Sequence, residues 1–462
     1  MQGQPFPQSR ALRRIAAPLG GMVAAAAAAV VMTAACTEDA RAIDPFPIRV
    51  DVSRGPVALA VNTGEGPVPA IIDTGTPLTL MDRFVDGEPL TVARRRKVTV
   101  TLLGLDDVGE PTISRARFPD TTTIELHPCP GDGICRVGLG DEAVEFRAIV
   151  GADILARSAA RFDFPSAELR FFPETSGDSS DLGDDCHAVI GQAFAGGGTL
   201  LVGGTEIVFG ALRPVVGACL DQEGAPDDEE RGSDALMMLS TGLGVSVLAA
   251  SSYERYAAES GAPPLDSLPS GELHFPSGPA EVRLGQVGSL ALVGSLGQTS
   301  EDLQDRGPCR ELYLNRVMAT RACEDPDSGI ADDCPCPGQA SFCTASAAVD
   351  IDRSIEVAVL DDGHPVLQAL RDELRPETPE LDGILGTRAL ASLRLELDYL
   401  NDRMVMRCMV GDDCETLPAV RNEAARDHLD RCREQEAMLT DAGPPGDGGL
   451  LPPDAGADGG AP

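Results

Sequence analysis

The sequence predicts a mainly β protein that is built from two related halves. The main observation is an internal repeat, because residues 149–163 and 384–398 share one pattern of residue types. Each copy places an aspartate 12 positions after a glycine, Gly151 or Gly386, that follows two apolar residues. A second observation is that residues 48–80 alternate short apolar runs with Gly/Pro turns, which is typical of strands.

An apolar run that ends in an acid precedes the first copy of the repeat. In residues 70–80 the run leads into Asp73, Thr74 and Gly75 and is followed by more apolar residues. A carboxylate at the end of an apolar strand is costly to bury unless hydrogen bonds compensate, so its presence indicates a use. The aspartate can act as a general base, and the glycine allows a tight turn. These three residues are therefore candidate catalytic residues.

The repeat predicts a second turn of the same kind in the second half. Residues 235–248 keep the apolar lead and exit, but Ser240 stands where the acid belongs, before Thr241 and Gly242. Over roughly residues 47–408 the pattern resembles the bilobal, pepsin-like aspartic peptidases, whose lobes each supply one Asp-(Thr/Ser)-Gly turn. The resemblance implies two related β-barrel-like lobes with a central cleft, in which two aspartates face each other and hold one water.

The resemblance also implies a peptide or protein segment as the partner in the cleft, but the second motif is degenerate. In the family chemistry, two carboxylates about 3 Å apart share a proton, and one takes a proton from water while the other gives one to the substrate. Ser240 is a neutral hydroxyl that cannot supply this proton. Asp234 cannot replace it, because six residues of extended chain span about 20 Å.

Three hypotheses about function follow from this incomplete pair. The first is an exported binding module for peptides or proteins with impaired or absent proteolysis. The second is an active aspartic endopeptidase that uses Asp73 and an unidentified second acid. The third is a structural surface lipoprotein whose cleft has no ligand.

The N-terminus predicts export. Residues 1–35 combine arginines, an apolar alanine-rich run and small residues, which is the pattern of a signal peptide. Cys36 follows and resembles the lipid attachment site of bacterial lipoproteins, so residues 36–46 would tether the protein to a membrane, in the periplasm or at the cell surface. Two alternatives stay open. Cleavage at residues 40–42, Ala-Arg-Ala, would give a secreted protein, and an uncleaved anchor would need about 20 apolar residues, more than the run contains.

The other boundaries follow from the repeat and from changes in composition. The stretch from Ser240 to Gly386 is longer than that from Asp73 to Gly151, and the excess locates an insertion. We expect lobe 1 at 47–173, a linker at 174–185, lobe 2 at 186–415 with a Cys-rich insertion at about 300–348, a C-terminal helical segment at 416–440 and a disordered tail at 441–462.

The cysteines also favour export. The chain has 13, and an even number is left once Cys36 is lipidated or removed, as a disulfide framework requires. Cys129 with Cys135 and Cys408 with Cys414 bracket short turns and could close locally, while the other pairings stay open. Zinc is the rival interpretation of the Cys-Pro-Cys in the insertion, and it is disfavoured because neighbouring histidines and a second Cys-x-x-Cys pair are missing there.

Composition and motifs exclude several other classes. The net charge of −36 argues against a nucleic-acid partner, so the basic run 94–97 is interpreted as a solvated strand edge. There is no Gly-x-Ser-x-Gly and no His-Glu-x-x-His motif, and the acidic stretch 325–329 does not complete a calcium loop. We therefore expect no cofactor and no metal.

Overall fold

The computed structural model describes residues 47–418, except 83, 86–87, 91, 107, 127–134, 173–187, 192–193, 203–204, 222–230, 294–306, 311, 313–345, 352, 375–379 and 412. We call residues 47–172 the first half and residues 188–418 the second half. The predicted signal peptide, Cys36, the tether, the linker 174–185 and the tail 441–462 lie outside the described residues, as does nearly all of the insertion at 300–348.

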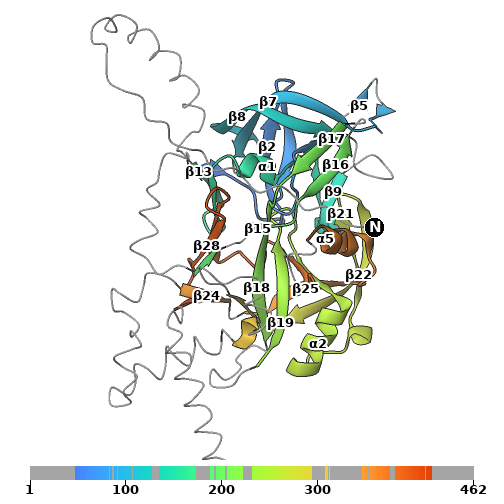
Figure 1. The fold of residues 1–462 in the computed structure, drawn as a ribbon, viewed down its shortest axis with the longest axis vertical. Coiled ribbons are helices and arrows are strands. Elements are labelled where there is room, and N and C mark those ends of the chain that lie inside the picture. Colours follow the sequence, from blue (N-terminus) through green and yellow to red (C-terminus); the bar gives the residue numbers. More distant parts are fainter. Residues whose placement is uncertain are drawn as a thin grey trace, which may run out of the picture. The chain divides into compact units, whose positions relative to one another are not determined.

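The first half consists almost entirely of strands. Its elements are β1 (Ile48–Arg49), β2 (Val57–Asn62), β3 (Pro67–Ile72), β4 (Leu80–Met81), β5 (Phe84–Val85), β6 (Glu88–Pro89), β7 (Arg94–Leu105), β8 (Pro111–Glu125), β9 (Cys135–Leu139), β10 (Val144–Phe146), β11 (Ala148–Val150), α1 (Ala152–Leu155), β12 (Ala159–Asp163) and β13 (Glu168–Phe172). Six strands close into a barrel in the order β11-β3-β2-β7-β8-β4. The long β7–β8 hairpin forms one wall (Figure 1), and β8 alternates exposed and buried side chains over much of its length because one face covers the core.

The second half is also β-rich but carries two longer helices. Its elements are β14 (Ala188–Gly191), β15 (Phe194–Ala195), β16 (Gly198–Val202), β17 (Thr205–Phe209), β18 (Arg213–Asp221), β19 (Ser233–Leu239), β20 (Ser246–Ala249), α2 (Ala250–Ser260), β21 (Ser270–Phe275), β22 (Gly278–Val287), β23 (Ser289–Val293), β24 (Ser346–Ile351), β25 (Ile355–Leu360), α5 (Pro365–Leu374), β26 (Gly383–Leu385), β27 (Leu393–Asp398), β28 (Arg403–Cys408) and β29 (Glu415–Pro418). Most of these strands belong to one 19-stranded sheet that continues into the first half.

The repeat in the sequence corresponds to matched central strands in the two halves. In the first half β3 runs parallel to β11, with Ile72 opposite Val150. In the second half β19 runs parallel to β26, with Leu239 opposite Leu385. All four side chains are buried, because neighbouring strands and loops cover both faces of these central pairs. The predicted fold class, mainly β with two related, barrel-like halves, is confirmed.

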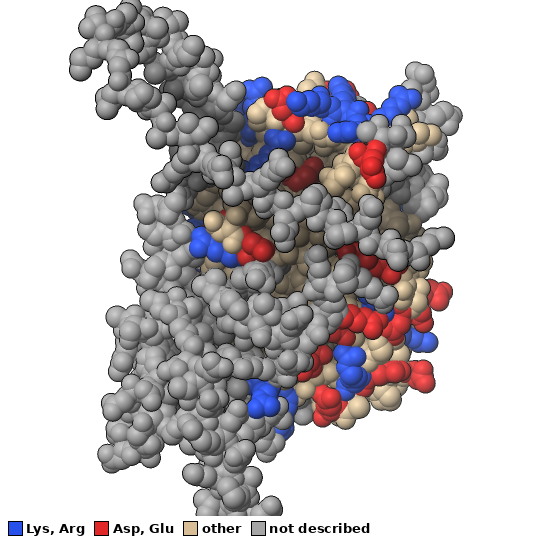
Figure 2. Space-filling model, in the orientation of Figure 1, with Lys and Arg blue, Asp and Glu red and all other residues tan. Residues whose placement is uncertain are grey.

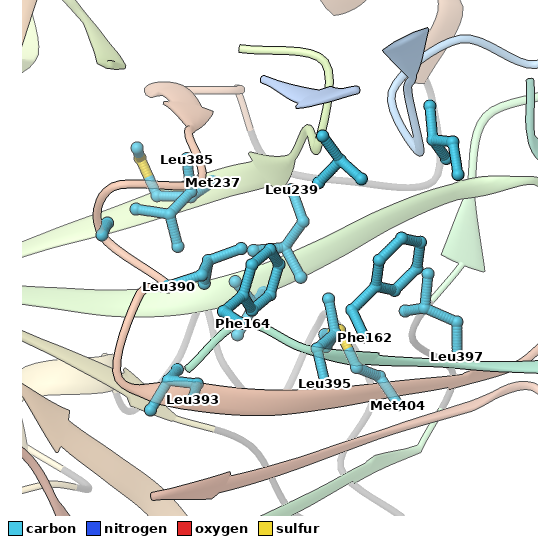
Figure 3. Packing of buried hydrophobic residues seen from close by; sticks show 14 of the residues in the cluster. Phe162, Phe164, Met237, Leu239, Leu385, Leu390, Leu393, Leu395, Leu397 and Met404 are labelled. Atoms are coloured by element: carbon cyan, nitrogen blue, oxygen red, sulfur yellow. The ribbon is translucent and has the colours of Figure 1, made fainter. Parts of the chain in front are cut away.

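One sheet joins the two halves, in the order β1-β13-β12-β27-β28-β14. Its central pair, β12 and β27, is antiparallel and sets Phe162 opposite Leu395. Figure 3 shows Phe162 and Phe164 of the first half among Leu393, Leu395 and Leu397 of the second. Each such side chain contributes about 1.5–3 kcal/mol on burial, so a shared core holds the halves together.

Equivalent aspartates end the two central strands of this shared sheet. Asp163 Oδ1 accepts a hydrogen bond from Ser166 N, and Asp398 Oδ1 accepts one from Asn401 N, both at 3.2 Å. The Oδ2 atom of each also accepts an arginine Nε–H, at 3.0 and 2.9 Å. Both acids therefore brace a turn, which is the structural role that their matching positions predict.

Two disulfides lie within the described residues. Cys408 and Cys414 are joined, as their spacing predicts. Cys219 of β18 is joined to Cys309, which ties the start of the cysteine-rich stretch to the core of the second half. Cys135 is disulfide-bonded as well, whereas Cys129 lies outside the described residues.

The predicted C-terminal helix at 416–440 is wrong at its start. Residues Glu415–Pro418 form strand β29, which pairs with β24 in antiparallel register. The main-chain hydrogen bonds offered by β24 outweigh the local preference for a helix. The remainder of that segment lies outside the described residues.

Charges are unevenly spread over the face shown in Figure 2. Lysine and arginine gather over the β7–β8 hairpin, and aspartate and glutamate dominate the second half. Within the basic run, Arg96 Nη1 donates to Glu65 at 2.8 Å and Glu125 at 3.2 Å, and these bonds raise the pKa of the guanidinium. Arg94, Arg95 and Lys97 are exposed, as a solvated strand would have them.

Candidate functional site

The two predicted turns meet between the halves. The first follows β3 and carries Asp73, and the second follows β19 and carries Ser240. Ser240 Oγ donates a hydrogen bond to Asp73 Oδ1 at 2.7 Å, although 167 positions separate the two residues. Asp73 stays partly exposed, while the Ser240 side chain is buried.

The threonines that follow these two residues form a reciprocal pair of hydrogen bonds. Thr74 N donates to Thr241 Oγ1, and Thr241 N donates to Thr74 Oγ1, both at 3.2 Å. Each hydroxyl then donates across the junction to a backbone carbonyl, Thr74 to Leu239 O and Thr241 to Ile72 O, both at 2.8 Å. Both threonine side chains are fully buried. The pair therefore fixes the two loops against each other with every hydroxyl satisfied.

The glycines of the repeat support the two loops from behind. Gly151 N donates to Thr79 Oγ1 at 3.1 Å, and Gly386 N donates to the equivalent Ser246 Oγ at 3.2 Å. A Cβ at Gly151 would lie 2.5 Å from the backbone carbon of Leu78, and one at Gly386 would lie 2.4 Å from a backbone oxygen. Only glycine fits either position, so the repeated glycines are explained by close backbone contact.

Asp73 acts as a hydrogen-bond acceptor in each of its side-chain contacts. Gly75 N and Ser240 Oγ donate to Oδ1 at 2.9 and 2.7 Å, and Thr76 Oγ1 donates to Oδ2 at 2.5 Å. Because all its neighbours are donors, the carboxylate can accept a further hydrogen bond from a bound group that donates one. Among the described residues no second carboxyl group hydrogen-bonds to Asp73 or to Ser240.

A second acid lies behind the first loop and has no counterpart in the second half. Asp153 Oδ1 accepts a hydrogen bond from Thr79 Oγ1 at 2.7 Å. Burial raises the pKa of Asp153 to about 6, against the opposing effect of the bonds from Thr79 and Ile154. Arg388 occupies the equivalent position in the repeat and instead pairs with Glu356 at 2.8 Å. Asp153 contacts the loop support and not Asp73 itself.

An ion pair that the sequence did not predict lies beside Gly75. Arg213 Nε and Nη2 each donate to Glu373, at 2.5 Å, and Nη1 donates to the Gly75 carbonyl oxygen. Arg213 is 9% exposed. The only signal in the sequence is a charged residue at the start of β18, ahead of residues 214–220 that are apolar or small, and this signal does not indicate a partner 138 positions away.

No metal centre is formed by the part of the chain that the structure describes, since no three His, Cys, Asp or Glu side chains gather as ligands there. The described helices are also too short or too polar to cross a bilayer. Cys36, the predicted lipid attachment site, lies outside the described residues.

No protein-family model and no curated protein matches the sequence. Among solved structures, the chain is similar to the aspartic proteinase from Irpex lacteus, with 12% identity and a TM-score of 0.32 over 79% of this chain and 97% of that one. It is also similar to basic 7S globulin from soybean, with 10% identity and a TM-score of 0.35 over 79% of this chain and 95% of that one.

Proposed function

We propose that this protein is an exported, aspartic-peptidase-like binding module that holds a peptide or protein segment beside Asp73 and does not cleave it efficiently. The observation that carries the proposal is the hydrogen bond from Ser240 Oγ to Asp73 Oδ1. A serine hydroxyl takes up the position where an acidic partner for Asp73 would have to lie.

The chemistry of Asp73 and Ser240 supports this interpretation. Peptide hydrolysis by two carboxyl groups requires one to accept a proton while the other donates one. Asp73 is available for the first task, but the pKa of a serine hydroxyl is far too high for the second. Loss of one member of a catalytic pair commonly costs several orders of magnitude in rate. The partial exposure of Asp73 leaves it accessible to a ligand group that can donate a hydrogen bond.

The decisive experiment is to restore the missing acid. Ser240→Asp should cleave denatured casein at acidic pH at a rate at least tenfold above that of the wild-type protein. Ser240→Asn is the matched control, because it adds a side chain of the same size without an acid. Adding Asp73→Asn to Ser240→Asp should abolish the gained activity.

Binding is measured on the wild-type protein with a statine peptide, which mimics the tetrahedral intermediate of aspartic peptidases. We expect saturable binding that Asp73→Asn weakens at least tenfold. Efficient cleavage by the wild-type protein, lost in Asp73→Asn, would instead identify an active endopeptidase with a second acid elsewhere. If the wild-type protein neither binds the statine peptide nor cleaves casein, the structural surface lipoprotein becomes the better description.

We also infer that the protein is exported and held at a membrane by a lipid on Cys36. The inference rests on the residues around Cys36 and agrees with the disulfides of the described chain. Metabolic labelling with palmitate should mark the wild-type protein and not Cys36→Ala. Release of the unlabelled wild-type protein into the medium would support ordinary signal cleavage instead.

A further inference from the structure

The two loops carry equivalent backbone carbonyls, at Gly75 and Gly242, but the hydrogen bonding of these carbonyls differs. Arg213 Nη1 donates to the Gly75 carbonyl, whereas no hydrogen bond to the Gly242 carbonyl is made by any described residue. The Gly75 amide itself donates to Asp73 Oδ1 at 2.9 Å, so a single residue, Gly75, separates the guanidinium from the central acid. The carbonyl on the Gly75 side of Asp73 is therefore already occupied.

Glu373 holds the guanidinium of Arg213 firmly in place. Arg213 and Glu373 form a two-pronged ion pair, with both nitrogen–oxygen distances at 2.5 Å. Their side chains are only 11% and 17% exposed. A planar guanidinium that binds a carboxylate through two parallel hydrogen bonds is among the most directional contacts available to a protein. Removing one partner of such a buried pair leaves an uncompensated charge, so each partner keeps the other in place.

Neighbouring elements confine the pair further. Arg213 begins β18, where it is paired with Ala195 of β15. Glu373 lies in the last turn of α5, and a Cβ at Gly196 would come within 3.0 Å of its Oε1. The ion pair therefore rests on two strands and a helix of the second half and reaches across to a loop of the first half.

An extended peptide that binds through its main chain needs free carbonyl acceptors for its N–H groups. We propose that the Arg213–Glu373 ion pair closes the Gly75 side of the site, so that the protein binds a peptide from one side of Asp73 only. The ligand class is then a chain end or a short segment, and a long chain that passes across both loops is excluded. This inference rests on the proposed function and specifies which ligands that function accepts.

Three statine peptides test the proposal by affinity measurement. One carries three residues on each side of the statine, and the other two carry three residues on only one side. The wild-type protein should bind one of the one-sided peptides as tightly as the two-sided peptide, within about threefold, and the other at least tenfold more weakly.

The double variant Arg213→Met/Glu373→Met should open the closed side. Replacing a buried ion pair by apolar side chains of similar length is often neutral for stability, so this variant is expected to fold. It should bind the two-sided peptide at least tenfold more tightly than the wild-type protein does. Arg213→Gln, which is shorter than arginine and can still donate a hydrogen bond to Glu373, removes the guanidinium from the Gly75 carbonyl and provides a second route to the same change. Arg170→Gln/Glu168→Gln removes an exposed pair at 2.8 Å elsewhere and should change no affinity.

The outcomes separate this inference from the function on which it rests. If the wild-type protein already gains affinity from residues on both sides, the closure is refuted while the binding function stands. The same holds if neither the double variant nor Arg213→Gln gains affinity for the two-sided peptide. If no statine peptide binds to the wild-type protein or to either variant, both proposals are overturned.

Discussion

The loop after β3 and the loop after β19 have the same framework and different chemistry. The hydroxyl pair of Thr74 and Thr241 is symmetric in every distance, and the supporting glycines meet the same obstacle in both halves. Yet one loop presents a carboxylate and the other a hydroxyl. The comparison teaches that the framework depends on threonine, glycine and backbone contacts, so the residue before the threonine can be an aspartate in one loop and a serine in the other within the same fold.

The largest expected effect comes from the glycines behind the loops. Gly151→Ala and Gly386→Ala should each lower the free energy of unfolding by more than about 3 kcal/mol or prevent folding, because the new Cβ would collide with backbone. Urea denaturation measures the cost. Gly210→Ala is the matched control, since its Cβ would meet nothing within 4 Å. A mild effect at only one of the two glycines would show that the supports are not equivalent.

The threonine pair should give the next largest effect. Thr74→Val and Thr241→Val each remove a buried hydroxyl that donates one hydrogen bond and accepts another. We expect each to cost about 2–3 kcal/mol, because the abandoned carbonyl and amide stay buried. The double variant should cost less than the sum, since the two threonines bond directly to each other across one junction. Clearly unequal single costs in urea denaturation would contradict the symmetry.

Asp153 is a point at which the supports of the two loops differ, because its equivalent in the second half is Arg388. The pKa of Asp153 is raised to about 6, so its contribution to stability is present below pH 4 and is lost as the pH rises through 6. Asp153→Asn should therefore gain about 2 kcal/mol relative to wild type between pH 4 and pH 7. Thermal unfolding across this range measures the gain. Arg388→Gln should show no such trend, and a flat difference for Asp153→Asn would refute the assignment.

The smallest effect is expected at the turn aspartates of the shared sheet. Asp163→Ala and Asp398→Ala should each cost about 1 kcal/mol, because each loses a turn hydrogen bond and a partly exposed contact with arginine. Equal costs in denaturation experiments would agree with a duplicated structural role. A loss of ligand binding in one variant, without loss of stability, would instead assign that aspartate to the site.

Several features of the site were accessible from the sequence because they are local patterns that occur twice. The apolar lead into Asp73, the Thr-Gly pair after Ser240 and the spacing of Gly151 and Gly386 together predict two matched loops that meet. The expected helix at 416–440 failed at its first residues, because an available strand edge determines the structure of residues 415–418. Pairing with a distant strand leaves no periodic signal in so short a segment.

The sequence by itself determined the repeat in the chain, its β structure and the presence of Ser240 at the position that matches Asp73. Each of these follows from residue types at short or repeated spacings. Only the tertiary structure decided that Arg213 reaches Gly75 and Glu373, over 138 and 160 positions of chain, and that Cys219 joins Cys309. The physical reason is that such contacts depend on how strands and helices pack in space, and neither charge nor hydrophobicity along the chain encodes that arrangement directly.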